Sequence, residues 1–326
     1  MAIINILMIT YTFFTRTKLI FTLILIGLIQ QGLIAQEYGG SSDVRISDMV
    51  YGTLLTPEVP TSKIAIIIPG SGPTDRNGNQ QMMRNNSLKL LAESLAKEGI
   101  ASLRYDKRTL TLLKKNALQE ERLDFNMFIE DAVATIDYVK QQGRFKELYV
   151  IGHEQGSLIG MVAAQRADVQ GFISIAGSGQ SIDQTIIHQI GLQMPDLKDK
   201  AIHAFSTLKK EGRVTDYSPA LTSIFRPSVQ PFMASWMQYD PKVEIGKLTI
   251  PTLIINGTND IQTSKQEAIL LQEGNSEATL AIIEGMNHVL RIIDGDDLEN
   301  TKSYNNTKLP LAKELISTVA GFITTH

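Results

Sequence analysis

Three residues whose side chains can carry nucleophilic catalysis are Glu154, Asp260 and His288. An imidazole that is oriented by a carboxylate can remove a proton from a nucleophile or from water. Glu154 lies in the stretch YVIGHEQGSLIG, between Gly152 and Gly156. A strand, then Gly-x-x-x-Gly, then a helix is typical of a nucleophile elbow, a sharp turn that presents its central side chain at the top of a sheet. The sequence therefore predicts that Glu154 is presented as a reactive group.

The identity of the elbow residue decides which chemistry is open. The usual residue in this motif is serine, which attacks only after a base has removed its proton. A glutamate side chain has an unperturbed pKa of about 4.3 and is ionised at neutral pH without a base. Gly152 and Gly156 fit the elbow because side chains at these positions would collide with neighbouring backbone. The helix that follows directs its positive end at the site.

The candidate residues can meet only where several strands end at one edge of a sheet. Residues 44–55 predict a strand pair or a bent strand. Short apolar runs predict strands at 64–68, 100–105, 148–151, 172–175, 252–255 and 279–283. Helical spacing predicts helices at 88–97, 126–142, 157–166 and 309–323. The alternation predicts an α/β fold with a mostly parallel central sheet flanked by helices, and function at the carboxyl ends of its strands.

The segment at about residues 180–247 interrupts this alternation. It is helix-like, rich in methionine and aromatic residues, and falls between two predicted core strands. We interpret it as a helical cap insertion over the sheet. The alternative is a second helical layer that has no role in substrate binding, because methionine and aromatic residues at such spacing often serve packing alone.

Four stretches in chain order carry a family resemblance. They are PGSGPTDRNGN, LRYDKR, GHEQG and the late pair NGTND and GMNH, each placed after a predicted strand. With them the chain resembles the α/β-hydrolase superfamily, in particular the secreted bacterial esterase or serine-aminopeptidase-like hydrolases. The resemblance covers nearly all of the chain after residue 36 and implies an α/β-hydrolase fold.

The resemblance also implies site residues. The family order of nucleophile, acid and histidine places Glu154, Asp260 and His288 in a triad, with glutamate where the family has serine. It implies an oxyanion hole made by the backbone N–H groups of Ser71 and Gln155. Residues 104–108, which include four charged side chains, are interpreted as a structural ion-pair cluster or as catalytic groups, and the sequence does not separate these options.

Three interpretations of Glu154 stay open. In the first, the protein is a hydrolase of a small ester, amide, epoxide or related substrate, with Glu154 as a carboxylate nucleophile or as the base for water. In the second, it is a catalytically degenerate ligand-binding protein in which a Glu154–His288 ion pair fills the site. In the third, the hydroxyl of Ser71, Ser157 or Ser178 takes over, although none of these lies on an elbow. A structural or sensing module that uses the fold as a scaffold is a further class.

The composition of the chain limits the kinds of partner and cofactor that we expect. The chain has 326 residues, a formal net charge of −3 and no cysteine. The charge gives no indication of nucleic-acid binding, and the absence of cysteine excludes disulfides, thiolate metal sites and a cysteine nucleophile. No spacing typical of a metal site or of a phosphate-binding loop is present, so we expect a small-molecule substrate, no cofactor and no metal.

The N-terminus has the pattern of a signal peptide. Arg16 and Lys18 precede an apolar run at residues 19–29, and a cleavage point follows Ala35. We therefore expect residues 1–35 to be removed and residues 36–326 to form a periplasmic or secreted hydrolase domain without stable membrane insertion. An uncleaved N-terminal anchor is the alternative, although the run is short for a membrane span.

Overall fold

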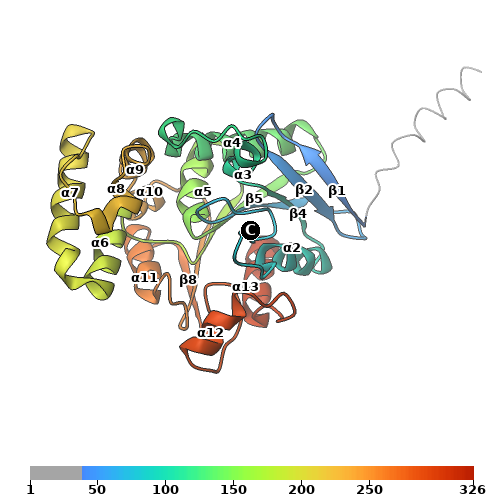
Figure 1. Cartoon of the computed structure of the whole chain (residues 1–326). Helices are drawn as coiled ribbons and strands as arrows, with labels where there is room; N and C mark the ends of the chain where they lie inside the picture. The colour runs from blue at the N-terminus through green and yellow to red at the C-terminus, as the bar shows by residue number, and fades with distance from the viewer. Residues whose placement is uncertain (1–38) are drawn as a thin grey trace, which may run out of the picture. The chain divides into compact units, whose positions relative to one another are not determined.

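The computed structural model describes residues 39–326, and the predicted signal peptide at residues 1–35 lies outside the described residues (Figure 1). Within residues 39–326, eight strands form one sheet in the order β1-β2-β4-β3-β5-β6-β7-β8. The strands are β1 (Gly40–Arg45), β2 (Tyr51–Thr56), β3 (Lys63–Ile68), β4 (Ala101–Tyr105), β5 (Glu147–His153), β6 (Gly171–Ile175), β7 (Thr252–Gly257) and β8 (Thr279–Ile283). Strands β1 and β2 pair antiparallel, as do β2 and β4. All other pairs are parallel.

Strand β3 lies inside the sheet, between β4 and β5, and shows why its sequence is continuously apolar. Ile64, Ile66 and Ile68 belong to one core cluster, whereas Ala65 and Ile67 belong to the other. Successive side chains of a strand point to opposite faces, so a strand that is covered on both faces must be apolar at every position. The predicted α/β sheet is therefore confirmed.

Helices cover both faces of this sheet. One cluster includes side chains of α4 (Phe125–Gln141) and α5 (Gln155–Arg166). The other includes side chains of α2 (Ser87–Lys97) and α13 (Lys313–Thr325). Three further helices are short and do not follow from the apolar spacing of the sequence: α3 (Arg108–Lys114), α11 (Lys265–Gly274) and α12 (Asp297–Ser303). In residues 39–326, no helix has the length and apolar character needed to cross a membrane.

The segment between β6 and β7 forms helices, which lie together on one side of the sheet (Figure 1). They are α6 (Ile182–Gln193), α7 (Lys198–Glu211), α8 (Thr222–Phe225), α9 (Gln230–Trp236) and α10 (Pro241–Ile245). Residues of α6 to α9 form an apolar cluster of their own, in which Phe205 and Phe225 meet edge to face at 4.7 Å. Helix α9 joins the core where Trp236 stacks on Phe125, with 5.3 Å between ring centroids.

Candidate active site

Glu154 occupies a strained turn between β5 and α5. Its backbone has φ 52° and ψ −118°, a region that side-chain-bearing residues rarely adopt. The turn is held on both sides, because the Glu154 N–H donates to the Ile175 carbonyl at 3.0 Å and the Ser157 N–H donates to the Glu154 carbonyl at 2.9 Å. The geometry is that of the predicted elbow, with Glu154 at its apex.

The glycines of the elbow are required by sterics. A Cβ on Gly152 would lie 2.2 Å from the Gly156 carbonyl oxygen, and a Cβ on Gly156 would lie 2.3 Å from the Ile68 carbonyl oxygen. Backbone cannot move aside as a flexible side chain can, so any other residue at either position would push β5, α5 and β3 apart. This close packing of backbone fixes the position of Glu154 relative to the strands.

His288 and Asp260 form the histidine–carboxylate pair that the sequence predicts. Asp260 follows β7 and His288 follows β8, so neighbouring parallel strands bring them together. The His288 Nδ1 lies 2.9 Å from Asp260 Oδ2, and their side chains are 6% and 1% exposed. The N–H groups of Gln262 and Thr263 both donate to Asp260 Oδ1 at 2.8 Å. This carboxylate is therefore fixed, and it holds the His288 ring through Nδ1, while Nε2 makes no hydrogen bond with any of residues 39–326.

The pair also sets the protonation of His288. Burial alone would lower the pKa of His288, but the charge and hydrogen bond of Asp260, together with the charge of Glu154, outweigh burial and raise it. His153 behaves in the opposite way. It is buried, its ring centroid lies 4.8 Å from that of His288, and its Nε2 is 3.0 Å from the His288 carbonyl oxygen. Burial, and then the neighbouring His288, lower the pKa of His153 to about 4.

This depressed pKa predicts an acid-sensitive stability. The unfolded chain binds a proton at His153 near pH 6.5, whereas the folded protein resists it until about pH 4. The stability that neutral His153 contributes is therefore present above pH 6.5 and is lost as the pH falls toward 4. A His153→Gln variant keeps a donor for the His288 carbonyl but has no group that titrates at this position. Between pH 6.5 and pH 4, we expect the free energy of unfolding to fall by on the order of 3 kcal/mol less in this variant than in the natural protein. Urea unfolding of both proteins at several pH values measures it, and parallel curves would contradict it.

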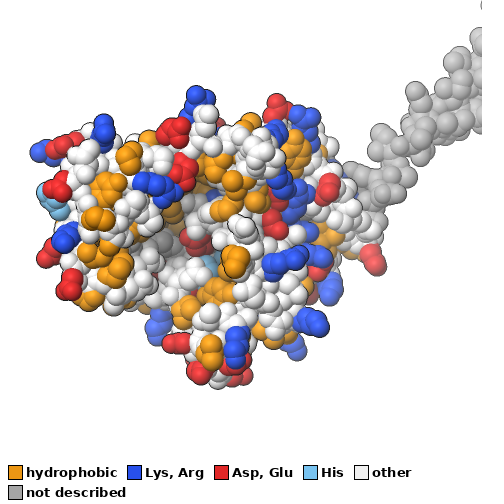
Figure 2. Space-filling model, viewed as in Figure 1, with side chains coloured by type: hydrophobic (Ala, Val, Ile, Leu, Met, Phe, Trp, Pro, Cys, Tyr) orange, Lys and Arg blue, Asp and Glu red, His pale blue; other side chains and the backbone are white. Residues whose placement is uncertain are grey.

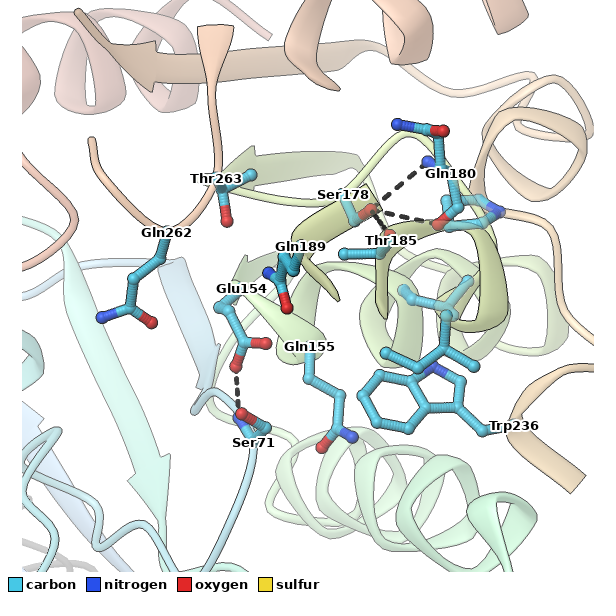
Figure 3. Close-up of a pocket in the computed structure, with 13 residues that line it drawn as sticks. Ser71, Glu154, Gln155, Ser178, Gln180, Thr185, Gln189, Trp236, Gln262 and Thr263 are labelled. Carbon is cyan, nitrogen blue, oxygen red and sulfur yellow. Dashed lines mark hydrogen bonds between the residues drawn. The ribbon is translucent and has the colours of Figure 1, made fainter. Parts of the chain in front are cut away.

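The Glu154 carboxylate faces the predicted oxyanion hole. Its Oε2 accepts a hydrogen bond from the Ser71 N–H, as the dashed line in Figure 3 shows. Gly70 makes room for it, because a Cβ there would lie 2.7 Å from the same oxygen. Among residues 39–326, no hydrogen bond or ion pair joins Glu154 to His288, so the ion pair expected for a degenerate site is not formed. The N–H of Gln155, the first residue of α5, has no hydrogen-bond partner in the same part of the chain.

Two cavities adjoin the elbow. The larger has a volume of about 350 Å³ and lies between the elbow, the loop after β6, and helices α6 and α9. Figure 2 shows a hollow in one face of the molecule, beside which acidic and histidine side chains are visible. The smaller, about 40 Å³, is lined by both Glu154 and His288, with Ser71 and Gln262. A polar cavity of this size has room for a water molecule.

One residue of the charged cluster for which the sequence left both a structural and a catalytic role open lies beside the site. Lys107, in the charged cluster at residues 104–108, is almost fully buried, and its Nζ donates to Gln155 Oε1 and lies 4.5 Å from the centroid of the Phe128 ring. Burial lowers the pKa of Lys107 to about 8, against the opposing charges of Glu154 and Asp131. Asp106 and Arg108 form ion pairs with Arg76 and Asp131, so they are structural.

Ser157 and Ser178, the other hydroxyls considered, are engaged elsewhere. The Ser157 Oγ is buried 2.7 Å from the Ser174 Oγ. The Ser178 Oγ lies in a network with Thr185 and Glu267 that holds the loop after β6. The described residues contain no group of three or more histidine, aspartate and glutamate side chains placed to hold a metal ion.

Comparison with known proteins adds the following similarities. Residues 84–292 match the family model described as serine aminopeptidase, S33, a span that includes Glu154, Asp260 and His288. Esterase EstD of Thermotoga maritima is 27% identical over 230 residues, which are 69% of this chain and 54% of that protein. The chain thus spans about half the length of this curated relative.

Solved structures share the fold. Est1E from Butyrivibrio proteoclasticus superposes with a TM-score of 0.55 and 17% identity, covering 88% of this chain and 100% of that one. Proline iminopeptidase from Mycobacterium smegmatis has a TM-score of 0.53 and 14% identity, covering 88% and 98%. At these identities the likeness concerns the arrangement of strands and helices.

Proposed function

Because this chain belongs to the S33 serine aminopeptidase family of the α/β-hydrolase superfamily, and because its elbow carries a carboxylate, we propose that it is a hydrolase in which Glu154 is the nucleophile. The proposed substrate is a small molecule with an electrophilic saturated carbon, such as an epoxide or an alkyl ester that is cleaved at its alkyl–oxygen bond. Asp260 and His288 would activate the water that completes the reaction.

The observation that carries the proposal is the hydrogen bond from the Ser71 N–H to Glu154 Oε2. It holds one carboxylate oxygen in the oxyanion hole and leaves Oε1 as the free nucleophilic oxygen (Figure 3). The same bond disfavours acyl transfer of the serine type, because the carbonyl oxygen of an ester substrate would compete with Oε2 for the Ser71 N–H. A carboxylate that attacks a saturated carbon needs no oxyanion hole for its substrate, so the arrangement suits that reaction.

The proposed reaction has two stages, which are alkylation of the Glu154 carboxylate and hydrolysis of the resulting ester. Oε1 forms a bond to the substrate carbon while the bond to the leaving oxygen breaks and that oxygen takes the electron pair. Oε2 is then the carbonyl oxygen of a glutamyl ester. His288 Nε2 removes a proton from a water in the small cavity, and the hydroxide attacks Cδ of Glu154. The developing charge on Oε2 is stabilised by the Ser71 and Gln155 N–H groups. The Cδ–Oε1 bond then breaks, and His288 gives its proton to the departing alkoxide. The second proton of the water, which remains on the new Glu154 carboxyl group, passes to the oxygen that left in the first step, and the carboxylate is restored.

Single-turnover hydrolysis of terminal epoxides in ¹⁸O-water tests this route. We expect one heavy oxygen in the Glu154 carboxylate, detected by mass spectrometry of the peptide that contains it, because water attacks the glutamyl ester. Label in the product alone would instead make Glu154 a base for water. The Glu154→Gln variant is the control, and it should show neither turnover nor labelling.

A second candidate is a ligand-binding protein without turnover. The observation that favours it is again the hydrogen bond from the Ser71 N–H to Glu154, because this N–H would otherwise be free to bind a substrate oxygen. Saturable ligand binding together with no turnover of epoxides, alkyl esters or acyl esters would support this candidate over the hydrolase.

A further inference from the structure

The larger cavity is lined mainly by uncharged polar groups, together with the apolar side chains of Leu158, Ile182, Trp236 and Pro241. Gln155, Gln180, Gln189 and Gln262 contribute amides to its wall, and Ser178, Thr185 and Thr263 contribute hydroxyls (Figure 3). Glu154 is the one charged side chain among the described residues that line it. The Gln189 amide makes no hydrogen bond with any part of residues 39–326, so its donors and its acceptor are available to a ligand. A group rich in hydroxyls or amides, without a negative charge, fits this wall.

A third cavity, of about 320 Å³, lies on the other side of Gln155 and has the opposite character. Apolar side chains dominate its wall: Leu113, Leu118, Leu123, Phe128, Val229 and Phe232. Glu120 and Arg226 also border it, but they pair with each other at 2.6 and 3.0 Å. Neither charge is therefore left to bind a ligand, and an alkyl or aryl group fits this space.

The two cavities share one partition. Ser71, Gln155 and Trp236 line both of them. Lys107 holds the Gln155 side chain by its Oε1, and Trp236 is held by its stack on Phe125, so the partition is fixed from both sides. A molecule that occupies both cavities therefore contacts this partition, which includes Ser71, whose N–H binds the carboxylate of Glu154.

We propose that the substrate is an amphiphile without a negative charge, with a hydroxyl- or amide-bearing head in the glutamine-lined cavity and an alkyl or aryl tail in the apolar cavity. The placement of the reacting bond at Glu154 rests on the proposed function, whereas the binding of such an amphiphile is independent of it. Glu154 repels an anionic head, and none of the described residues that line the polar cavity carries a positive charge to compensate.

Trp236 reports on occupancy because it is the only tryptophan of the chain and lines both cavities. We would titrate the full-length protein with 1-O-alkylglycerols of increasing chain length and follow tryptophan fluorescence. Affinity should rise about fourfold for each added methylene until the apolar cavity is full. Glycerol should bind far more weakly than 1-O-octylglycerol, as should octanoate. This titration needs no turnover, so its outcome is independent of the ¹⁸O experiment.

Two variants separate the cavities. Val229→Phe reduces the apolar cavity and should abolish the gain from long chains while leaving short-chain ethers unchanged. Gln189→Leu should weaken all alkylglycerols about threefold to tenfold and leave the dependence on chain length intact. An affinity that does not depend on chain length would overturn the proposal. So would octanoate binding as tightly as 1-O-octylglycerol, because that result would show that Glu154 does not exclude an anionic head.

Discussion

A Glu154→Ser variant is expected to react with a fluorophosphonate probe and to hydrolyse short acyl esters about 100-fold or more faster than the natural protein. The substitution removes the carboxylate that occupies the Ser71 N–H, so the oxyanion hole becomes available to an acyl substrate. It also places a hydroxyl on an elbow that already has a histidine oriented by Asp260. Labelling by the probe, read by intact-protein mass spectrometry, and ester turnover measure the effect.

The Glu154→Ala variant is the matched control for this experiment. It also frees the Ser71 N–H but supplies no nucleophile, so it should be neither labelled nor active. If Glu154→Ser folds as stably as the natural protein and yet reacts with no probe, His288 does not serve the elbow, and the triad assignment is wrong.

A His288→Gln variant is expected to lose steady-state turnover by about 10² to 10⁴-fold and to accumulate a covalent substrate adduct on Glu154. The two effects go together because alkylation of the carboxylate needs no base, whereas hydrolysis of the resulting ester needs His288 to deprotonate water. Mass spectrometry of the intact variant after incubation with an epoxide would show the added mass of one substrate molecule, and peptide mapping would place it on Glu154.

Two further variants test the assignment of roles. Asp260→Asn removes the charge that raises the pKa of His288 and should give a smaller loss of turnover with partial accumulation of the adduct. The double variant Glu154→Gln/His288→Gln should form no adduct. An adduct on any other residue, or lost turnover with no adduct while substrate still binds, would count against covalent catalysis by Glu154.

Much of the architecture was accessible from the sequence because it depends on local rules. The continuous apolar runs of β3 and β5 follow from burial on both faces of a parallel sheet. The short helices α3 and α11 lacked a comparable signal, since seven or ten residues show too few turns for a periodicity to stand out.

The elbow motif and the chain order of the predicted site residues could also be read from the sequence alone. Gly152 and Gly156 must be glycines because backbone fills the space where a Cβ would stand, and that constraint is visible in the motif itself. The placement of Asp260 and His288 after the last two strands brings them to one edge, since neighbouring parallel strands end there. The sequence also shows directly that the central residue of this motif is Glu154.

Tertiary structure alone decided where the Glu154 carboxylate points and what surrounds it. It bonds to the Ser71 N–H and not to His288, and this choice depends on a loop 83 residues away in the chain and on the room that Gly70 leaves. The bond from Lys107 to Gln155, and the partition with Trp236, likewise join side chains from three distant segments. Rotamers and cavities arise from packing between segments that are distant in the chain. The periodicity of apolar residues along the sequence does not indicate which of these segments will be in contact.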